Sequence, residues 1–255
     1  MSTLVMPGAE SVSITEGTRG GVLLLHGYTA TAQQLRNWGE AFAQAGFAVE
    51  VPLLPGHGTL PDEMITTGWS DYISCADASY RKLAEQHTRI LVGGLCLGGN
   101  LAAALAMKYP ETTAGLMVIN GPFRSPNNGR PEIWRQILKT GKQFFTWSTT
   151  PKFVEDPQAP AVLSYDRVPI APMESLYYAL NDQRERLSEI HCPVLVFSSV
   201  HDTSNSEDDI KPWIEEVSGP AEHVVLEHSN HVATLDYDKG LLESRSIEFA
   251  LAAVK

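Results

Sequence analysis

The sequence has little cysteine, and what it has excludes two common ways of stabilising a chain. Its 255 residues include three cysteines, Cys75, Cys96 and Cys192. They are too few and too scattered for a disulfide framework, and no Cys-x-x-Cys pair indicates a zinc site. Free cysteine behaves as a small buried hydrophobe, so we interpret Cys75 and Cys192 as packing residues. No metal, nucleotide or flavin motif is visible either, so no cofactor is predicted.

The sequence also lacks basic clusters and long apolar runs. The formal net charge is -11, and Lys and Arg are not gathered anywhere, which argues against nucleic acid as a partner. Between Met1 and Glu10 no basic region precedes a long apolar stretch, so neither a signal peptide nor a membrane span is visible. We therefore expect a cytoplasmic protein without stable membrane insertion that acts on a small molecule. A monomer and a homodimer remain open.

Short apolar runs alternate with helical stretches along most of the chain. This alternation predicts an α/β fold, with a mostly parallel central sheet flanked by helices. The expected strands are 21–25, 47–51, 90–93, 116–119, 194–197 and 224–226. The expected helices are 32–45, 69–86, 101–108 and 241–254.

The stretch 121–190 interrupts the alternation. It has helical pieces but no convincing strand, and it contains eight prolines and many apolar side chains. A solvated linker would not expose so much apolar surface. We interpret residues 1–120 and 191–255 as the core and 121–190 as an inserted helical cap. Packing of these residues onto the main core is the alternative.

The most informative segment is Gly94-Leu95-Cys96-Leu97-Gly98. It lies between an expected strand and an expected helix, and small residues flank its centre. Strand, sharp glycine-flanked turn and helix together are typical of a nucleophile elbow, where a nearby Cβ would clash. The sequence therefore predicts that Cys96 is a nucleophile, where serine is usual.

A nucleophile needs a base, and the base needs an orienting acid. Asp202 follows the strand expected at 194–197, and His231 follows the strand expected at 224–226. We predict that both are catalytic, with the acid alternatively supplied by Glu207, Asp208 or Asp209. Asp236 and Asp238 are interpreted as helix caps.

The loop His26-Gly27-Tyr28-Thr29 follows the first expected strand. Its turn can point a backbone N–H at a reacting carbonyl, with the N–H of Leu97 as second donor. We therefore predict an oxyanion hole formed by Tyr28 and Leu97, and a further role for the Tyr28 ring in the acyl pocket. His26 and His57 are interpreted as structural.

With these residues the chain resembles the α/β-hydrolase superfamily, and is particularly similar to small bacterial carboxylesterases and monoacylglycerol lipases. The resemblance rests on His-Gly-Tyr-Thr, Pro-Gly-His-Gly, Gly-Leu-Cys-Leu-Gly-Gly and Ser-Asn-His-Val-Ala-Thr-Leu-Asp. It implies cleavage of short or medium acyl esters by a triad of Cys96, Asp202 and His231. Two residues depart from the pattern: the cysteine at the elbow, and Asn230 where glycine is common.

The cysteine leaves several interpretations open. A thiolate at Cys96, favoured by a protonated His231 and the helix N-terminus, would form an acyl thioester. Water as second nucleophile gives a carboxylesterase, and another acceptor gives an acyltransferase; a thioesterase is a further alternative. The resemblance also includes natural cysteine members, and the sequence is compatible with a serine enzyme carrying a Ser→Cys change or with a binding protein.

Acyl length depends on the cap, which the sequence describes only as apolar. Helix packing is an equal alternative for each candidate lining residue. Besides Tyr28, the candidates for binding a small acyl ester or thioester are Phe123, Trp134, Phe144, Phe145 and Trp147.

Overall fold

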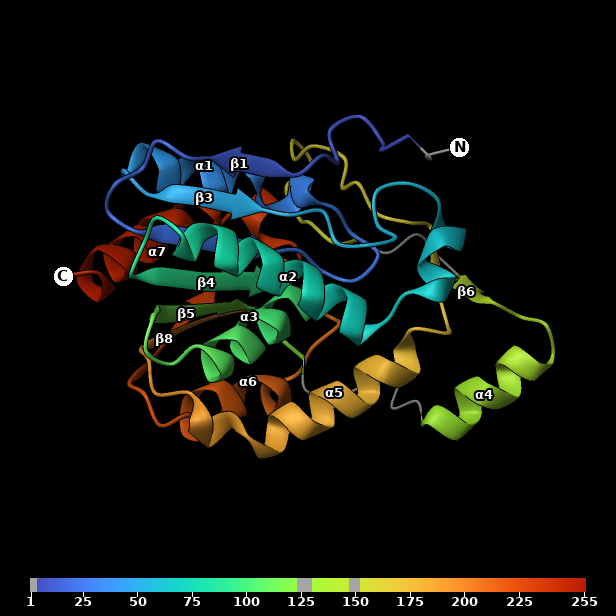
Figure 1. The fold of residues 1–255 in the computed structure, drawn as a ribbon. Helices are drawn as coiled ribbons and strands as arrows, with labels where there is room; N and C mark the ends of the chain where they lie inside the picture. The colour runs from blue at the N-terminus through green and yellow to red at the C-terminus, as the bar shows by residue number, and fades with distance from the viewer. Residues whose placement is uncertain (1–3, 123–129, 147–151) are drawn as a thin grey trace.

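A seven-stranded sheet forms the centre of the protein in the computed structural model, which describes residues 4–122, 130–146 and 152–255 (Figure 1). Its strand order is β1-β3-β2-β4-β5-β8-β9, and every neighbouring pair is parallel except β1 with β3. The strands are β1 Val12–Ile14, β2 Gly21–Leu25, β3 Ala48–Val51, β4 Ile90–Leu95, β5 Thr113–Ile119, β8 Val194–Ser199 and β9 Ala221–Leu226. The loops that follow the parallel strands consequently meet at one edge.

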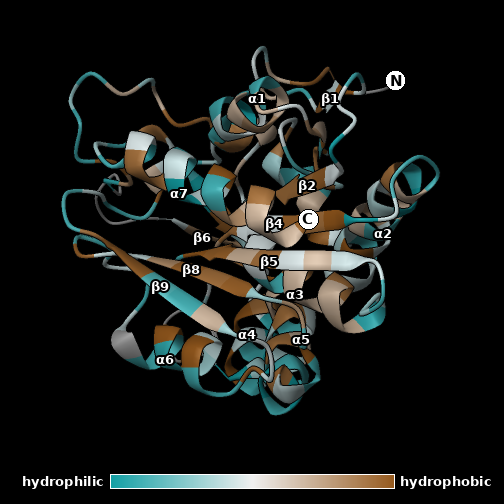
Figure 2. Ribbon diagram, turned by 90° about the vertical axis from the view of Figure 1, so that its left-hand side faces the viewer, coloured by the Kyte–Doolittle hydropathy of each residue, from teal (hydrophilic) through white to brown (hydrophobic). Residues whose placement is uncertain are grey.

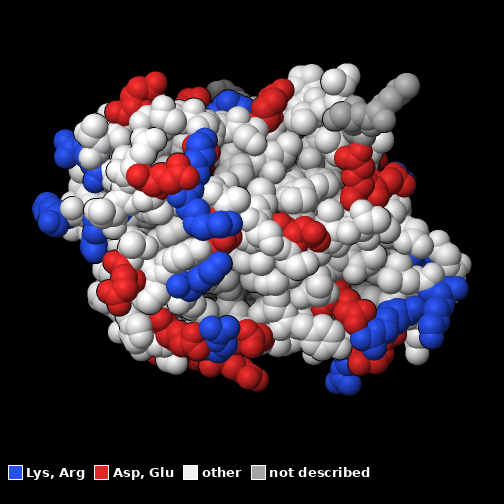
Figure 3. Space-filling view, viewed as in Figure 1, with Lys and Arg blue, Asp and Glu red and all other residues white. Residues whose placement is uncertain are grey.

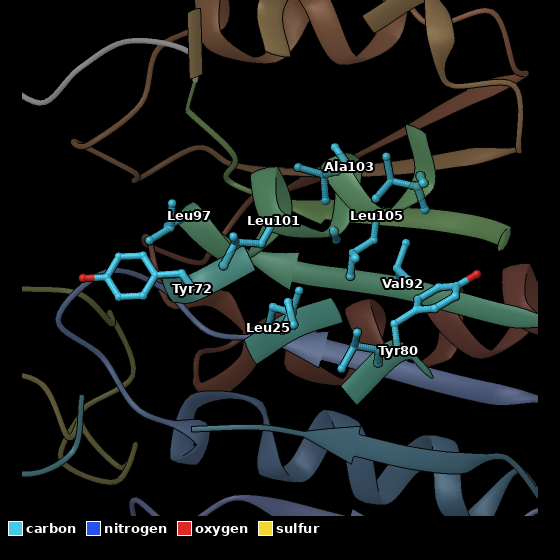
Figure 4. Close-up of a cluster of buried hydrophobic side chains, with 14 of the residues drawn as sticks. Leu25, Tyr72, Tyr80, Val92, Leu97, Leu101, Ala103 and Leu105 are labelled. Carbon is cyan, nitrogen blue, oxygen red and sulfur yellow. The ribbon is translucent and has the colours of Figure 1, made fainter. Parts of the chain in front are cut away.

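Helices cover both faces of the sheet. One buried cluster joins α2 and α3 to the sheet, as the close-up in Figure 4 shows, and includes residues of α5 and α6. A second cluster joins α1 and α7 to the opposite face. Strands buried on both faces are rich in apolar residues, which Figure 2 shows as brown ribbon. The helices are α1 Arg36–Gln44, α2 Trp69–Ala84, α3 Leu97–Lys108, α4 Pro131–Lys139, α5 Met173–Glu185, α6 Glu207–Glu215 and α7 Lys239–Ala253, with short 3₁₀ helices η1 Ala32–Leu35, η2 Pro61–Thr66, η4 Leu187–Glu189 and η5 Ala233–Leu235.

The stretch between β5 and β8 contains α4, α5 and a small second sheet. That sheet pairs β6, Phe144–Thr146, with β7, Arg167–Pro169, in antiparallel register. Our expectation of no strand between residues 121 and 190 is therefore wrong, because three-residue strands are too short to produce a recognisable pattern. Trp134, Val168, Ile170 and Met173 form a separate buried cluster in this stretch. Lys and Arg side chains gather over α4 on the face seen in Figure 3.

The expected strands of the main sheet are confirmed, and one strand and one α-helix of the core were missed. The missed elements are β1, a short antiparallel strand at the sheet edge, and α6, which follows β8. The first stretch expected as helix divides into η1 and α1. In the described part of the chain, no helix is both long enough and apolar enough to cross a membrane.

Candidate active site

Cys96 lies at the sharp turn between β4 and α3. Its backbone has φ 55° and ψ -124°, a left-handed φ that non-glycine residues rarely adopt. Its N–H donates a 2.9 Å hydrogen bond to the carbonyl of Ile119, at the end of the neighbouring strand β5. The turn is thereby fixed to the sheet, and the side chain of Cys96 stands at the N-terminal end of α3.

The glycines around Cys96 are required by close backbone contacts. A Cβ on Gly98 would lie 1.7 Å from the Leu25 carbonyl oxygen, and one on Gly94 would lie 2.2 Å from the carbonyl carbon of Gly98. Both distances are far below van der Waals contact, so neither position accepts a side chain without a shift of the backbone. The glycine spacing that pointed to an elbow in the sequence is therefore explained by the packing of β2 against α3.

His231 and Asp202 meet beside Cys96. His231 Nδ1 lies 2.9 Å from Asp202 Oδ2, and the His231 side chain is also hydrogen-bonded to Cys96. Only 10% of the His231 side chain and 3% of the Asp202 side chain are exposed. Asp202 also accepts hydrogen bonds from the N–H of Ser204, at 2.7 Å, and from Asn205 Nδ2, at 3.1 Å. The structure thus joins the three residues that the sequence singled out, in the order Cys96, His231, Asp202.

The charges of this group are coupled. Burial alone would lower the pKa of His231, but the negative charge of Cys96 and the hydrogen bonds to Asp202 and Cys96 raise it to about 10. Burial opposes ionisation of Asp202, yet its bonds to His231, Ser204 and Asn205 hold its pKa below the usual range. These shifts favour a protonated His231 beside the ionised carboxylate of Asp202.

Burial governs the pKa values of the other two cysteines. Burial raises the pKa of Cys75 above its ordinary value, and it raises that of Cys192 to about 11. A thiol that stays protonated at neutral pH is a poor nucleophile. Both residues pack against the buried cluster on the α2 and α3 face, in agreement with their interpretation as packing residues.

Two backbone amides near Cys96 have no acceptor within the described residues. They are the N–H of Tyr28, in the loop after β2, and that of Leu97, the first residue of α3. The first N–H groups of a helix have no partner inside it. Gly27 places the loop close to the elbow, since a Cβ there would lie 3.4 Å from Cys96 Cβ. These are the two amides that the sequence suggested as oxyanion donors.

His26 and His57 are buried next to this loop and are neutral. His26 Nε2 accepts the Leu54 N–H at 3.0 Å, so its Nδ1 carries the proton and donates to the Gly27 carbonyl at 2.9 Å. Burial lowers the pKa of His26 to about 4. Burial, followed by the nearby His26, lowers that of His57 to about 3. The two hydrogen bonds of His26, and the lowered pKa values of both histidines, agree with the interpretation of His26 and His57 as structural residues.

Three other acidic residues considered in the sequence, Asp209, Asp236 and Asp238, have hydrogen-bond partners outside the triad. Asp209 accepts hydrogen bonds from the N–H and the hydroxyl of Ser206, at the start of α6. Asp238 directly precedes α7, but its side chain makes no capping bond to that helix and instead accepts from the His228 N–H and the Ser229 hydroxyl. The sequence predicted Asp236 as a helix cap, and this prediction is wrong. Asp236 accepts the backbone N–H groups of Glu155, Asp156, Asn230 and Tyr237. Asp236 thereby connects the segment 153–156, which is distant in the sequence, to the loop that carries His231.

Sequence reasoning missed the residues of this distant segment as neighbours of the site. Phe153 lies with its ring centroid 6.3 Å from that of His231, and its carbonyl accepts the Val232 N–H at 2.9 Å. Phe153, Val154 and Val162 pack against the same buried cluster as Cys96. Their apolar character was visible in the sequence, but nothing in it indicated which segment returns to the elbow.

The residues expected to bind substrate are partly described. The Tyr28 hydroxyl donates to the Pro169 carbonyl at 2.8 Å. Trp134 belongs to the small buried cluster between α4 and α5, Phe145 packs against that cluster, and the ring of Phe144 lies 4.1 Å from the Arg167 guanidinium. Phe123 and Trp147 lie outside the described residues. A role in substrate binding stays a prediction for all of them.

Comparison with known proteins defines the class. Residues 22–243 match the alpha/beta hydrolase family, and the chain belongs to it. This confirms the predicted α/β-hydrolase fold, with its mostly parallel sheet between helices.

Particular relatives narrow the likeness. The chain is 32% identical over 251 residues to a thermostable monoacylglycerol lipase of Bacillus sp. strain H-257, covering 96% of this chain and 95% of that protein. It is 25% identical over 239 residues to a carboxylesterase of Bacillus subtilis strain 168, covering 92% and 93%. A solved structure from work on two metagenome-derived lipolytic enzymes superimposes with a TM-score of 0.88 at 31% identity, covering 97% and 99%.

Proposed function

We propose that this protein hydrolyses carboxylic esters through a covalent acyl-enzyme on Cys96. The observation that carries the proposal is the hydrogen-bonded group of Cys96, His231 and Asp202 beside the amides of Tyr28 and Leu97, which have no acceptor among the described residues. The lipase and carboxylesterase named above support an ester as the substrate class. We further propose that residues 121–190 act as a cap that selects the acyl chain.

The reaction has two steps. In the first, the Cys96 thiolate attacks the ester carbonyl, and the amides of Tyr28 and Leu97 stabilise the negative oxygen. The C–O bond to the alcohol then breaks, and His231 gives its proton to the departing alkoxide. In the second step, His231 takes a proton from water as that water attacks the thioester. The acid is released, the Cys96 thiolate is regenerated and His231 is again protonated.

Acyl transfer is the second candidate, and the cysteine itself favours it. A thioester is a good acyl donor, so an alcohol or amine that reaches the site ahead of water would receive the acyl group. The site's residues keep the same roles in both reactions, and only the second nucleophile differs. Thioester substrates fit the same chemistry, because the leaving group is then a thiol.

Incubation with p-nitrophenyl butyrate, followed by nitrophenolate release and intact mass, tests the proposal. Continuous release at a constant rate supports hydrolysis. A single burst with a stable mass gain of one butyryl group, mapped to Cys96, supports transfer and calls for added acceptors. The absence of both nitrophenolate release and a mass gain would contradict an acyl-enzyme.

A Cys96→Ser variant provides the matched comparison. An equal or lower esterase rate indicates that the site is adapted to cysteine. A large gain in rate would indicate that serine suits the site better, as expected of a serine enzyme that carries a Ser→Cys change.

A further inference from the structure

Asn120 contacts the loops of all three proposed catalytic residues. It follows directly after β5, is 1% exposed, and has a left-handed backbone with φ 47°. The residue before it, Ile119, accepts the N–H of Cys96. The backbone next to Asn120 therefore already fixes the turn that presents the nucleophile.

The side chain of Asn120 holds the loop of His231. Its Nδ2 donates a 2.9 Å hydrogen bond to the main-chain carbonyl of His231 and a 3.0 Å bond to Ser199 Oγ. Its Oδ1 accepts the Ser199 N–H at 2.9 Å. The amide nitrogen of Asn120 thus bonds the His231 loop and the end of β8, and its amide oxygen bonds the end of β8. The position of the imidazole is tied through its own backbone to the sheet.

The backbone of Asn120 is linked to Asp202, the third of the proposed catalytic residues. Its carbonyl accepts a 2.6 Å hydrogen bond from Asn205 Nδ2, and the same Nδ2 lies 3.1 Å from Asp202 Oδ2. Its N–H donates to the Phe197 carbonyl of β8 at 3.0 Å. Asn205 therefore connects Asn120 with the carboxylate that orients His231.

We propose that Asn120 is a positioning residue that sets the distances between Cys96, His231 and Asp202, acting together with Asn205. The inference rests on the proposed function, because it concerns residues that position the proposed catalytic triad. Asparagine suits the position for two reasons. It tolerates the left-handed backbone better than most residues, and its amide supplies one donor group and one acceptor group.

The chemistry explains why such a residue matters. Proton transfer requires His231 to stay within hydrogen-bond reach of both the thiol and the leaving group, and a shift of about 1 Å can cost about 100-fold in rate. The Asn120 bonds are buried, and a lost partner would leave the His231 carbonyl unpaired. The effect of removing them should appear in the chemical step rather than in substrate binding.

Asn120→Gly is the sharpest variant, because glycine keeps the left-handed backbone while it removes the side chain. We expect kcat for p-nitrophenyl butyrate to fall about 30-fold, with KM changed less than about 3-fold. The matched control is Gln183→Ala. Gln183 is also a buried amide, with two hydrogen bonds to Asn100 and none to the triad. It should lose stability but keep its kcat within about 2-fold.

Asn120→Asp is the conservative companion. A carboxylate keeps the acceptor for the Ser199 N–H but has no donor for the His231 carbonyl, so kcat should stay low. An Asn120→Gly protein with unchanged kcat, or with a change in KM alone, would overturn the proposal. So would a Gln183→Ala protein that loses as much kcat as Asn120→Gly.

Asn205→Ala keeps the test open if Asn120→Gly does not fold, since Asn205 is less buried. It removes the link between Asn120 and Asp202, and we expect a fall of about 5-fold in kcat with KM unchanged. A kcat within the error of the unmodified protein would contradict the proposal.

Alkylation of Cys96 by iodoacetamide separates this inference from the proposed function. The rate, followed by peptide mass at neutral pH, depends on the thiolate that His231 stabilises and requires no ester turnover. We expect it to fall about 10-fold in Asn120→Gly and to be unchanged in Gln183→Ala. If the unmodified protein shows no turnover, the proposed function fails, while unequal alkylation rates would still support the role of Asn120. Equal rates would overturn it.

Discussion

The protein has three buried histidines among its described residues, and the acid–base properties of His231 are opposite to those of His26 and His57. His26 and His57, beside the loop after β2, are 0% and 1% exposed, and His231 is 8% exposed. Burial lowers the pKa of His26 to about 4 and, with the nearby His26, that of His57 to about 3. At His231 the opposing effects of Cys96 and Asp202 outweigh burial, and the pKa is about 10.

The difference shows that the partner atoms, not the burial, decide the charge of a histidine here. His26 has a carbonyl on one ring nitrogen and a backbone N–H on the other, a set that only the neutral ring satisfies. His231 has a carboxylate on Nδ1 and a thiol group as its other hydrogen-bond partner. A neutral ring is suited to hold a loop, whereas a ring between two acidic groups is suited to move protons.

The largest effect is expected from removing the thiol. Cys96→Ala should lower kcat/KM for p-nitrophenyl butyrate at least about 1000-fold, because no nucleophile remains. It should also lower the pKa of His231, since burial would then be opposed by Asp202 alone. Initial rates test the first expectation, and NMR titration of the histidines tests the second. A His231 pKa that stays near 10 would show that Cys96 carries no charge in the pair.

The next largest effect is expected from Asp202→Asn. The amide no longer holds His231 in the tautomer that donates from Nδ1, and we expect kcat to fall about 1000-fold or somewhat less. Asp209→Asn is the matched control, because Asp209 binds Ser206 at the start of α6. It should keep kcat within about 2-fold. A larger loss in Asp209→Asn than in Asp202→Asn would transfer the acid's role to α6, an alternative that the sequence left open.

The sequence predicted those parts of the site that depend on short-range constraints. The elbow was recognisable because Gly94 and Gly98 are needed within a few residues of Cys96. The order of strands placed Asp202 and His231 at the same sheet edge, since the carboxyl ends of parallel strands lie together. The main sheet was predictable for the same reason, because buried parallel strands are continuously apolar.

The remainder depends on contacts between distant segments, which leave no local pattern. The side chain of Asn120 bonds Ser199 and His231, which are 79 and 111 residues away in the sequence. Asp236 binds amides about 80 residues away and looks in the sequence like an ordinary helix cap. Phe153 was visible only as an apolar residue. In each case the residue type was known, and the partner was supplied by the fold.

The pH dependence of the unfolding free energy tests the contrast between His57 and His231. His57 has a lowered pKa in the folded state, so its neutral form stabilises the fold above pH 6.5, and this contribution is lost as the pH falls. His57 Nδ1 lies 3.0 Å from the Pro55 carbonyl oxygen. His57→Asn keeps a donor for this carbonyl but does not titrate. Between pH 6.5 and about 4 it should lose about 3 kcal/mol less unfolding free energy than the unmodified protein, measured by urea denaturation.

The opposite slope is expected on the basic side. His231 has a raised pKa, so its contribution is present below pH 6.5 and is lost as the pH rises towards about 10. Cys96→Ala should reduce this loss, because the folded protein then holds the His231 proton less firmly. Parallel curves for the unmodified protein and Cys96→Ala above pH 7 would contradict the charged pair.

The smallest effect is expected from Asn230→Gly, which introduces the residue common at this position in similar hydrolases. Asn230 Oδ1 accepts the His231 N–H at 2.7 Å, and its Nδ2 donates to Glu155 at 2.8 Å, while its own N–H binds Asp236. Glycine retains only the last bond. Because Asn120 and Asp202 still hold His231, kcat should fall no more than about 3-fold, with a loss of about 1 kcal/mol in unfolding free energy. Glu155→Gln, which keeps an acceptor for Asn230 and loses only the surface ion pair with Lys152, is the control and should leave kcat unchanged. A loss of 30-fold or more in Asn230→Gly would mean that His231 depends on the segment around Phe153 as much as on the sheet.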